Sequence, residues 1–215
     1  MDPMTFPYPS RRSLLALGAA TVLALAGCDG KLPGLGGSST KPAFKAVDIT
    51  GAEYARTLTL TDAATGQKRS LTDFKGKVVV VFFGYTQCPD VCPTTMTELA
   101  EVKRSLGADG ARVQGIFVSV DPERDTPALL KEYVANFGPD ISGWVGTPDE
   151  VKAAAKAFKV FYSKVPGKTE TSYTVDHTAG SYVFDTQGRV RLFTRYGSGA
   201  KALADDLKLL LAETS

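Results

Sequence analysis

The chain has 215 residues, of which 43% are hydrophobic and 22% are charged, and its formal net charge is +2. This length and hydrophobic content are enough for one good core, so we expect a single globular domain after processing. A net charge this close to zero lacks the basic footprint that phosphate binding needs, which argues against nucleic acid as a partner.

The first 27 residues have the pattern of an export signal. The pair Arg11-Arg12 precedes an uncharged run over 14–27, shorter than the about 20 residues of a membrane-spanning helix but suited to a signal peptide. The run ends in Leu25-Ala26-Gly27-Cys28, which resembles the lipobox of bacterial lipoproteins, where the cysteine is lipidated. We predict a signal peptide over 1–27 and a lipid anchor on Cys28 that holds the domain in the periplasm. An ordinary signal peptide cut nearby would instead leave a free thiol, and the general or twin-arginine export route stays open.

A tether and then the folded domain are expected after the signal. Residues 28–43 are predicted to be the lipidated cysteine and a flexible linker, because this stretch is rich in glycine and serine. The domain is predicted over 44–215. Its first elements are two strands of a β-hairpin between 56 and 71, indicated by the alternation Thr57-Leu58-Thr59-Leu60 and the turn residues that follow.

Two buried strands and a helix are predicted next. The continuous apolar run at 77–83 is typical of a strand covered on both faces in a mainly parallel sheet. Proline is favoured at the first helical position, so Pro93 predicts a helix that runs toward Gly107 with Cys92 at about the N-cap. A second buried strand is predicted at 113–120.

The remaining pattern alternates helices and strands. Thr126-Pro127 and Thr147-Pro148 are helix start signals, with helices expected through 137 and 158. A hairpin is predicted from 181–185 and 190–193, and a closing amphipathic helix from 200 to 211. Alternating elements that end in a hairpin and a helix indicate an α/β fold with helices packed on a sheet.

The cysteine pair Cys88 and Cys92 is the most informative chemical feature. The pair lies between a buried strand and a helix, and a helix N-terminus lowers the pKa of a thiol from about 8.5, so we expect Cys92 to be a reactive thiolate. His177 is the only histidine, and Met96 is a fourth soft donor, although its place in a helix is more typical of core. Two thiolates and one imidazole suit Cu(I), or Cu(II) with an added oxygen ligand, whereas structural zinc needs a fourth ligand.

Sequence chemistry alone leaves three interpretations of the pair open: a metal site, a catalytic dithiol and a structural disulfide. Export to an oxidising compartment is compatible with the disulfide. His177 taken alone is equally an ordinary hydrogen-bonded histidine. Asp176, Asp121 and Asp125 are candidate outer groups of a site or partner contacts, but turn and capping roles explain the last two equally well.

With these residues in hand, the chain closely resembles the SCO/SenC family of copper proteins over nearly the whole predicted domain. The matching segments occur in order along the chain: Asp48-Ile49-Thr50-Gly51, Phe82-Phe83-Gly84-Tyr85-Thr86-Gln87-Cys88-Pro89-Asp90-Val91-Cys92-Pro93, Val120-Asp121-Pro122-Glu123-Arg124-Asp125-Thr126-Pro127 and Val175-Asp176-His177. The resemblance implies a thioredoxin-like α/β fold with a central mixed sheet, flanking helices and an extra N-terminal β-hairpin. It also implies copper, Cu(I) or Cu(II), bound by Cys88, Cys92 and His177.

The resemblance further implies a role in cytochrome c oxidase assembly. The leading hypothesis is a copper metallochaperone that delivers the ion to the CuA centre of oxidase subunit II. The alternative is a thiol-disulfide reductase, with Cys88 and Cys92 as its catalytic pair, that keeps the cysteines of that centre reduced. A redox or copper-homeostasis role and peroxide reduction are further hypotheses. Other periplasmic copper chaperones and thioredoxin-like reductants are additional expected partners.

Overall fold

The computed structural model describes residues 43–169 and 172–213, and its centre is an eight-stranded mixed β-sheet with the order β1-β10-β9-β4-β5-β6-β2-β3. The strands of this sheet are β1 (Val47–Asp48), β2 (Thr59–Asp62), β3 (Lys68–Ser70), β4 (Val78–Gly84), β5 (Val113–Ser119), β6 (Ile141–Val145), β9 (Gly180–Phe184) and β10 (Val190–Arg195). The predicted signal peptide, the anchor on Cys28 and nearly all of the predicted tether lie outside the described residues.

Four α-helices and two short 3-10 helices accompany the sheet in the part of the chain that the structure describes. They are α1 (Val91–Ser105), α2 (Pro127–Ala135), α3 (Pro148–Phe158), α4 (Ala200–Ala212), η1 (Leu71–Phe74) and η2 (Gly107–Arg112). Within residues 43–169 and 172–213, no helix combines the length and the apolar character that crossing a bilayer requires.

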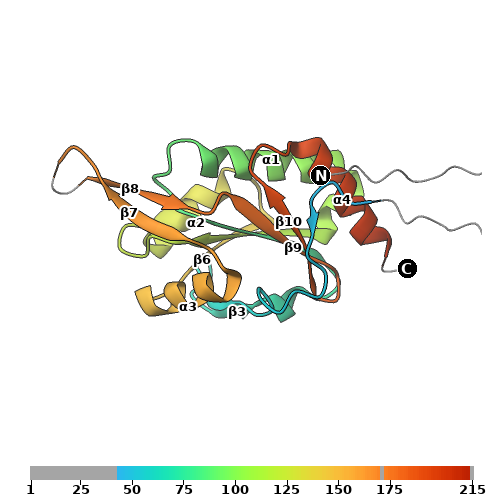
Figure 1. Ribbon diagram of the computed structural model, residues 1–215, viewed down its shortest axis with the longest axis horizontal. Coiled ribbons are helices and arrows are strands. Elements are labelled where there is room, and N and C mark those ends of the chain that lie inside the picture. The colour runs from blue at the N-terminus through green and yellow to red at the C-terminus, as the bar shows by residue number, and fades with distance from the viewer. Residues whose placement is uncertain (1–42, 170–171, 214–215) are drawn as a thin grey trace, which may run out of the picture. The chain divides into compact units, whose positions relative to one another are not determined.

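The helices cover both faces of the sheet (Figure 1), with α1, α2 and α4 on one face and α3 on the other. The parallel pairs β4–β5 and β5–β6 explain part of this arrangement, because successive right-handed crossovers leave α1 and α2 on the same face. Every residue of β4 and β5 is buried, which confirms the two doubly covered strands expected from their apolar runs. The core therefore runs along these central strands.

Most predicted elements are present, with ends that differ by a few residues. The N-terminal hairpin is β2–β3 and the later hairpin is β9–β10. Thr126 and Thr147 cap α2 and α3 by accepting backbone N–H bonds from Leu129 and Glu150, as their start signals indicated. The sequence pattern did not reveal β1, β6 or a second, two-stranded sheet of β7 (Tyr162–Pro166) and β8 (Tyr173–His177).

The predicted start of α1 was wrong by two residues. Asp90 is the N-cap, so Cys92 lies inside the first turn and Pro93 is the third helical residue. The N–H groups of the first turn have no partner inside a helix, so a proline is tolerated at any of these positions and does not fix the first one. Cys92 therefore has a helical backbone and a free N–H group that can point out of the helix end.

The sheet topology brings three separated segments to the same end of the central strands. Because β5 is parallel to β4, the loop after Ser119 emerges beside the loop after Gly84. Strand β9 is antiparallel to β4, with Ser181 opposite Phe82, so the chain just before Gly180 also lies at this end. Ligand sites of open α/β sheets commonly form where parallel strands end. The cysteine loop, the 121–127 turn and the end of β8 meet there for this reason.

Candidate metal centre

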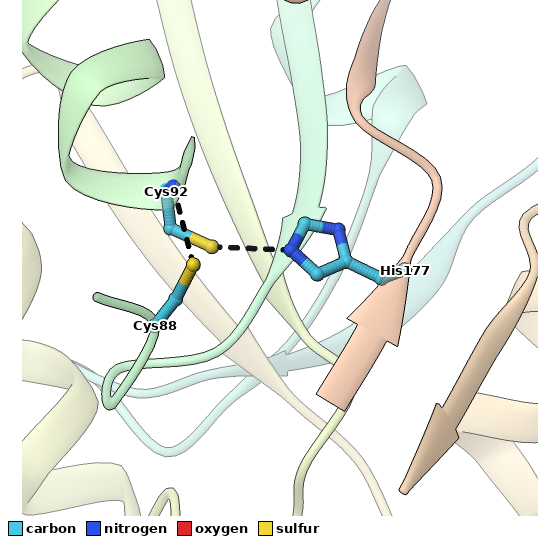
Figure 2. Close-up of side chains that lie close together, drawn as sticks. All are labelled: Cys88, Cys92 and His177. Atoms are coloured by element: carbon cyan, nitrogen blue, oxygen red, sulfur yellow. Dashed lines mark hydrogen bonds between the residues drawn. The ribbon is translucent and has the colours of Figure 1, made fainter. Parts of the chain in front are cut away.

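The two cysteines lie on either side of the start of α1, as Figure 2 shows. Cys88 is half-buried in the loop that follows β4, whereas Cys92 is fully buried in the first turn of the helix. The backbone N–H of Cys92 donates to the Cys88 sulfur at 3.4 Å. Both thiols are free, so the structure represents the reduced state of the pair.

His177 is the last residue of β8 and its ring faces the cysteines (Figure 2). Side chains alternate along a strand, so His177 shares the face of buried Val175, whereas exposed Asp176 points the other way. The ring Nδ1 lies 3.2 Å from the carbonyl oxygen of Thr178. A carbonyl only accepts, so Nδ1 carries the proton of this bond, and Nε2 is left with its lone pair toward Cys92 Sγ at 3.3 Å.

The three donor atoms are close enough to share one ion. The sulfurs of Cys88 and Cys92 and a ring nitrogen of His177 lie within 4.8 Å of one another. Two ligands of one ion with bonds of about 2.0–2.3 Å lie at most about 4.6 Å apart, so small side-chain rotations complete such a site. Two sulfurs and one imidazole nitrogen are soft donors of the kind that favours copper. The arrangement thus brings together all three residues singled out in the sequence.

Met96, the fourth soft donor, lies in the core. Its side chain is completely buried and belongs to the hydrophobic core, as its helical position suggested. The His177 ring is instead bordered by two aromatic rings, with centroid distances of 5.7 Å to Phe82 and 5.9 Å to Tyr85, both edge-on. These rings restrict the orientation of the imidazole and exclude water from one side of the site.

The two thiols have opposite electrostatic environments. A hydrogen bond from the Cys92 side chain lowers the pKa of Cys88 to about 4, and the backbone N–H groups of Asp90 and Cys92 act in the same direction. The pKa of Cys92 is raised, because the bond to Cys88 retains its proton and because burial disfavours its thiolate. In the reduced protein Cys88 is therefore the thiolate and Cys92 the thiol.

The expectation that Cys92 is the reactive thiolate was wrong. The helix N-terminus does stabilise a thiolate, but the stabilised thiolate is Cys88, because the N–H of Cys92 points at the Cys88 sulfur. Burial of Cys92 adds to the difference. The two-residue error in the predicted helix start led to this misassignment. If Cys92 were the N-cap, its own sulfur would accept hydrogen bonds from the free N–H groups of the first turn.

We predict that iodoacetamide alkylates Cys88 at a rate almost independent of pH between about pH 6 and about pH 8, because a group whose pKa is about 4 is already ionised there. The alkylation rate of an ordinary thiol would instead rise roughly tenfold with each pH unit over most of this range. Mass spectrometry of the reduced Cys28→Ser chain, which keeps only the pair, measures the rate at each site. A Cys88 rate that climbs steeply with pH would contradict the prediction.

The turn at 121–125 is built around two buried carboxylates. Asp125 accepts hydrogen bonds from the backbone and hydroxyl of Thr86 and from the hydroxyl of Ser119, at 2.6–3.3 Å, and burial raises its pKa. Asp121 forms an ion pair with Arg124 and accepts a hydrogen bond from the Tyr173 hydroxyl. Asp125 thus supports the cysteine loop, and Asp121 supports the strand of His177. Both roles go beyond a turn or capping role.

Arg124 and Tyr173 were not identified from the sequence. Arg124 donates to the carbonyl oxygen of Tyr173 and to the side chain of Gln87, next to Cys88. The alternation Tyr173-Thr174-Val175 before His177 was a usable signal for a strand there, but no local pattern indicates that an arginine 49 residues earlier contacts it. This link depends entirely on tertiary structure.

Comparison with known proteins gives a consistent result. The SCO1/SenC family model matches residues 47–212. The mitochondrial SCO2 homolog of Bos taurus is 36% identical over 182 residues, covering 79% of this chain and 66% of that protein, so the chain spans slightly less than two thirds of this relative.

Solved structures agree with the sequence matches. ScoI of Bradyrhizobium japonicum with copper bound is 43% identical, with a TM-score of 0.64, covering 71% of this chain and 96% of the other. Yeast Sco1 with copper bound is 30% identical, with a TM-score of 0.65, covering 81% and 91% of the two chains. These similarities and the observed sheet confirm the expected thioredoxin-like α/β fold.

Proposed function

Because the chain belongs to the SCO1/SenC family, we propose that it is a copper metallochaperone that holds copper between Cys88, Cys92 and His177. We further propose that it passes the ion to the CuA centre of cytochrome c oxidase subunit II during assembly of the oxidase. The single observation that carries the proposal is the set of three soft donor atoms within 4.8 Å of one another. Copper bound to ScoI of B. japonicum and to yeast Sco1 supports the choice of ion.

The unequal burial of the donors is suited to transfer. Cys92 is fully enclosed, whereas Cys88 and His177 are each only half-buried. An incoming ligand of an acceptor protein can therefore approach the ion from the side of Cys88 and His177 while Cys92 still holds it. Exchange of ligands one at a time avoids releasing a free ion, which is what delivery between two proteins requires.

We also propose the location expected from the sequence, with a lipid on Cys28 and the domain in the periplasm. The receiving centre of the oxidase would then be on the same side of the membrane. Periplasmic copper chaperones are proposed as donors of the ion, and thioredoxin-like reductants as the source of electrons that keep Cys88 and Cys92 reduced.

Transfer to an acceptor tests this function. The copper-loaded chain is mixed with the reduced, copper-free soluble domain of an oxidase subunit II, and the visible absorption of the assembled CuA centre is followed. We expect the centre to form with the wild type and not with the double variant Cys88→Ser, Cys92→Ser, which lacks both thiolates. Equal formation with the two proteins would show that the copper arrived from solution, and would overturn the proposal.

A second candidate is a thiol-disulfide reductase, favoured by the lowered pKa of Cys88 beside the protonated, buried Cys92. The Cys88 thiolate would attack a partner disulfide and release one partner thiolate. Once deprotonated, Cys92 would attack the Cys88 sulfur, release the second partner thiolate and leave a Cys88–Cys92 disulfide. The same pair would serve a wider redox or copper-homeostasis role.

The reductase assignment predicts that His177→Ala keeps most of the rate on a disulfide peptide copied from the CuA site, because neither chemical step needs the imidazole. Cys88→Ser should abolish the reaction, since it removes the attacking sulfur. Thiol release from the peptide measures both. No reaction by the reduced wild type across the range from about pH 6 to about pH 9 would dismiss this function, because Cys88 is ionised throughout that range.

A further inference from the structure

His177 lies at the base of a hairpin that is not paired with the main sheet. In the part of the chain that the structure describes, β7 and β8 pair only with each other, and the hairpin projects from the rest of the fold in Figure 1. The cysteines, in contrast, follow β4, which is paired on both sides. The pairing of β9 with β4 places the base of the hairpin near the cysteines, and the exact distance from the imidazole to the two sulfurs then depends on what fastens the rest of the hairpin to the cysteine loop.

Arg124 contacts the hairpin and the cysteine loop at the same time. Its Nη1 donates to the carbonyl oxygen of Tyr173, the first residue of β8, at 2.8 Å, and to the side-chain oxygen of Gln87 at 3.2 Å. Its guanidinium carbon lies 3.5 Å from the centre of the Tyr173 ring and 5.6 Å from that of Tyr85. A planar guanidinium makes such stacking and hydrogen bonds together, which a lysine cannot do.

Asp121 fixes Arg124 in turn. The Nε of Arg124 donates to one carboxylate oxygen of Asp121, and the Tyr173 hydroxyl donates to the other oxygen at 2.8 Å. The side chain of Asp121 is only 1% exposed and that of Arg124 19% exposed, so this charge pair is shielded from water. Asp121 follows β5, a central strand of the sheet, and the contact therefore connects the hairpin to the rigid core.

An exposed ion pair also joins this turn to the hairpin, and it is a weak alternative to Arg124. Lys164 of β7 lies 2.6 Å from Glu123, but the two side chains are 48% and 63% exposed. Exposed pairs of this kind contribute at most about 1 kcal/mol, and many contribute nothing measurable. Lys164 thus offers a matched control, since it joins the same turn to the same hairpin without touching the cysteine loop.

We infer that Arg124 is a positioning residue for copper, which fastens the β7–β8 hairpin to the cysteine loop and so sets the place of His177 relative to Cys88 and Cys92. The inference rests on the proposed function of the site and adds a residue that touches none of the three donor atoms. Groups that orient a metal ligand from outside typically change metal affinity about 10–100-fold when removed. Arg124 acts on the whole strand that carries the ligand.

The test compares Arg124→Gln with Lys164→Ala in the reduced, full-length Cys28→Ser chain. Cu(I) affinity is measured by anaerobic competition with a colorimetric chelator, and Co(II) serves as a second probe because its ligand-field absorption reports the number and geometry of its ligands. We expect Arg124→Gln to lower Cu(I) affinity about 10–100-fold and to change the Co(II) spectrum toward that of His177→Ala. Lys164→Ala should stay within about twofold of the wild-type affinity and keep its spectrum.

A double-mutant cycle separates positioning from general loosening of the fold. If Arg124 acts through His177, then Arg124→Gln placed in the His177→Ala background should change Cu(I) affinity by less than about twofold. The full effect of Arg124→Gln persisting in that background would overturn the inference. A wild-type affinity and spectrum of the single Arg124→Gln variant would overturn it as well, provided that His177→Ala does weaken binding.

Two further outcomes are distinguishable. If His177→Ala leaves copper affinity unchanged, the proposed site itself falls and the positioning role falls with it. If Arg124→Gln does not fold, as judged by circular dichroism, Gln87→Ala replaces it, because Gln87 is exposed and its loss removes only the contact with the cysteine loop. That variant is expected to lower Cu(I) affinity about threefold to tenfold, the scale of one ordinary hydrogen bond, because Gln87 is exposed, and no change would overturn the inference.

Discussion

Replacing His177 with alanine will lower the affinity for Cu(I) by at least about 100-fold, since even removing a group that only orients a metal ligand costs about 10–100-fold. Nε2 of His177 faces the Cys92 sulfur at 3.3 Å, and no other histidine exists in the chain to replace it. The fold should survive, because the ring is half-buried at the end of a peripheral hairpin, and we expect a loss of at most about 1 kcal/mol in the free energy of unfolding.

The measurement is an anaerobic titration of the reduced Cys28→Ser chain in competition with a colorimetric Cu(I) chelator. Asp176→Ala is the matched control, because Asp176 neighbours His177 on the same strand but is exposed on its opposite face. We expect this control to bind one equivalent of Cu(I) as tightly as the wild type. Unchanged affinity in His177→Ala would remove the histidine from the site and favour thiol-disulfide exchange as the main function.

Replacing Gly84 with alanine will damage both the fold and the copper site. A Cβ atom on Gly84 would lie 2.8 Å from a ring carbon of Phe82, 2.9 Å from the Cys92 sulfur and 3.0 Å from a ring carbon of Phe117. Overpacking a core in this way typically costs about 1–3 kcal/mol. Because one of the three contacts is a donor sulfur, Cu(I) affinity should fall by at least about tenfold in the folded fraction, the lower end of the effect of disturbing a metal ligand.

Gly115→Ala distinguishes the effect on the site from the effect on the core. Gly115 lies on the neighbouring strand β5, and its added Cβ would meet Leu99 at 2.9 Å and Ile141 at 3.0 Å, with no donor atom nearby. Chemical denaturation should show a similar loss of stability in both variants, whereas Cu(I) competition should show weakened binding only in Gly84→Ala. Equal copper affinity of the two folded variants would mean that displacing the Cys92 sulfur does not affect copper binding, and would contradict the prediction.

Local sequence patterns were sufficient for the elements whose burial or caps are encoded within a few residues. The apolar runs of β4 and β5 predicted strands covered on both faces, and Thr126 and Thr147 predicted the starts of α2 and α3. The β7–β8 hairpin was missed because nine of its ten residues are exposed or only partly buried, so the short alternation before His177 is the one hydrophobic signal that its sequence carries. Strand β6 was missed because only its environment, between two other strands, distinguishes it.

The sequence by itself singled out the candidate ligands, because thiols and an imidazole are properties of residue types, and apart from Cys28 the chain offers only Cys88, Cys92 and His177. Only the tertiary structure decided how they work together. The antiparallel pairing of β9 with β4 brings the base of the hairpin that carries His177 to the cysteines. The hydrogen bond from the Cys92 side chain lowers the pKa of Cys88, and the same bond and burial raise the pKa of Cys92. Distances and solvation arise from contacts between residues far apart in the chain, and no local pattern of residues contains them.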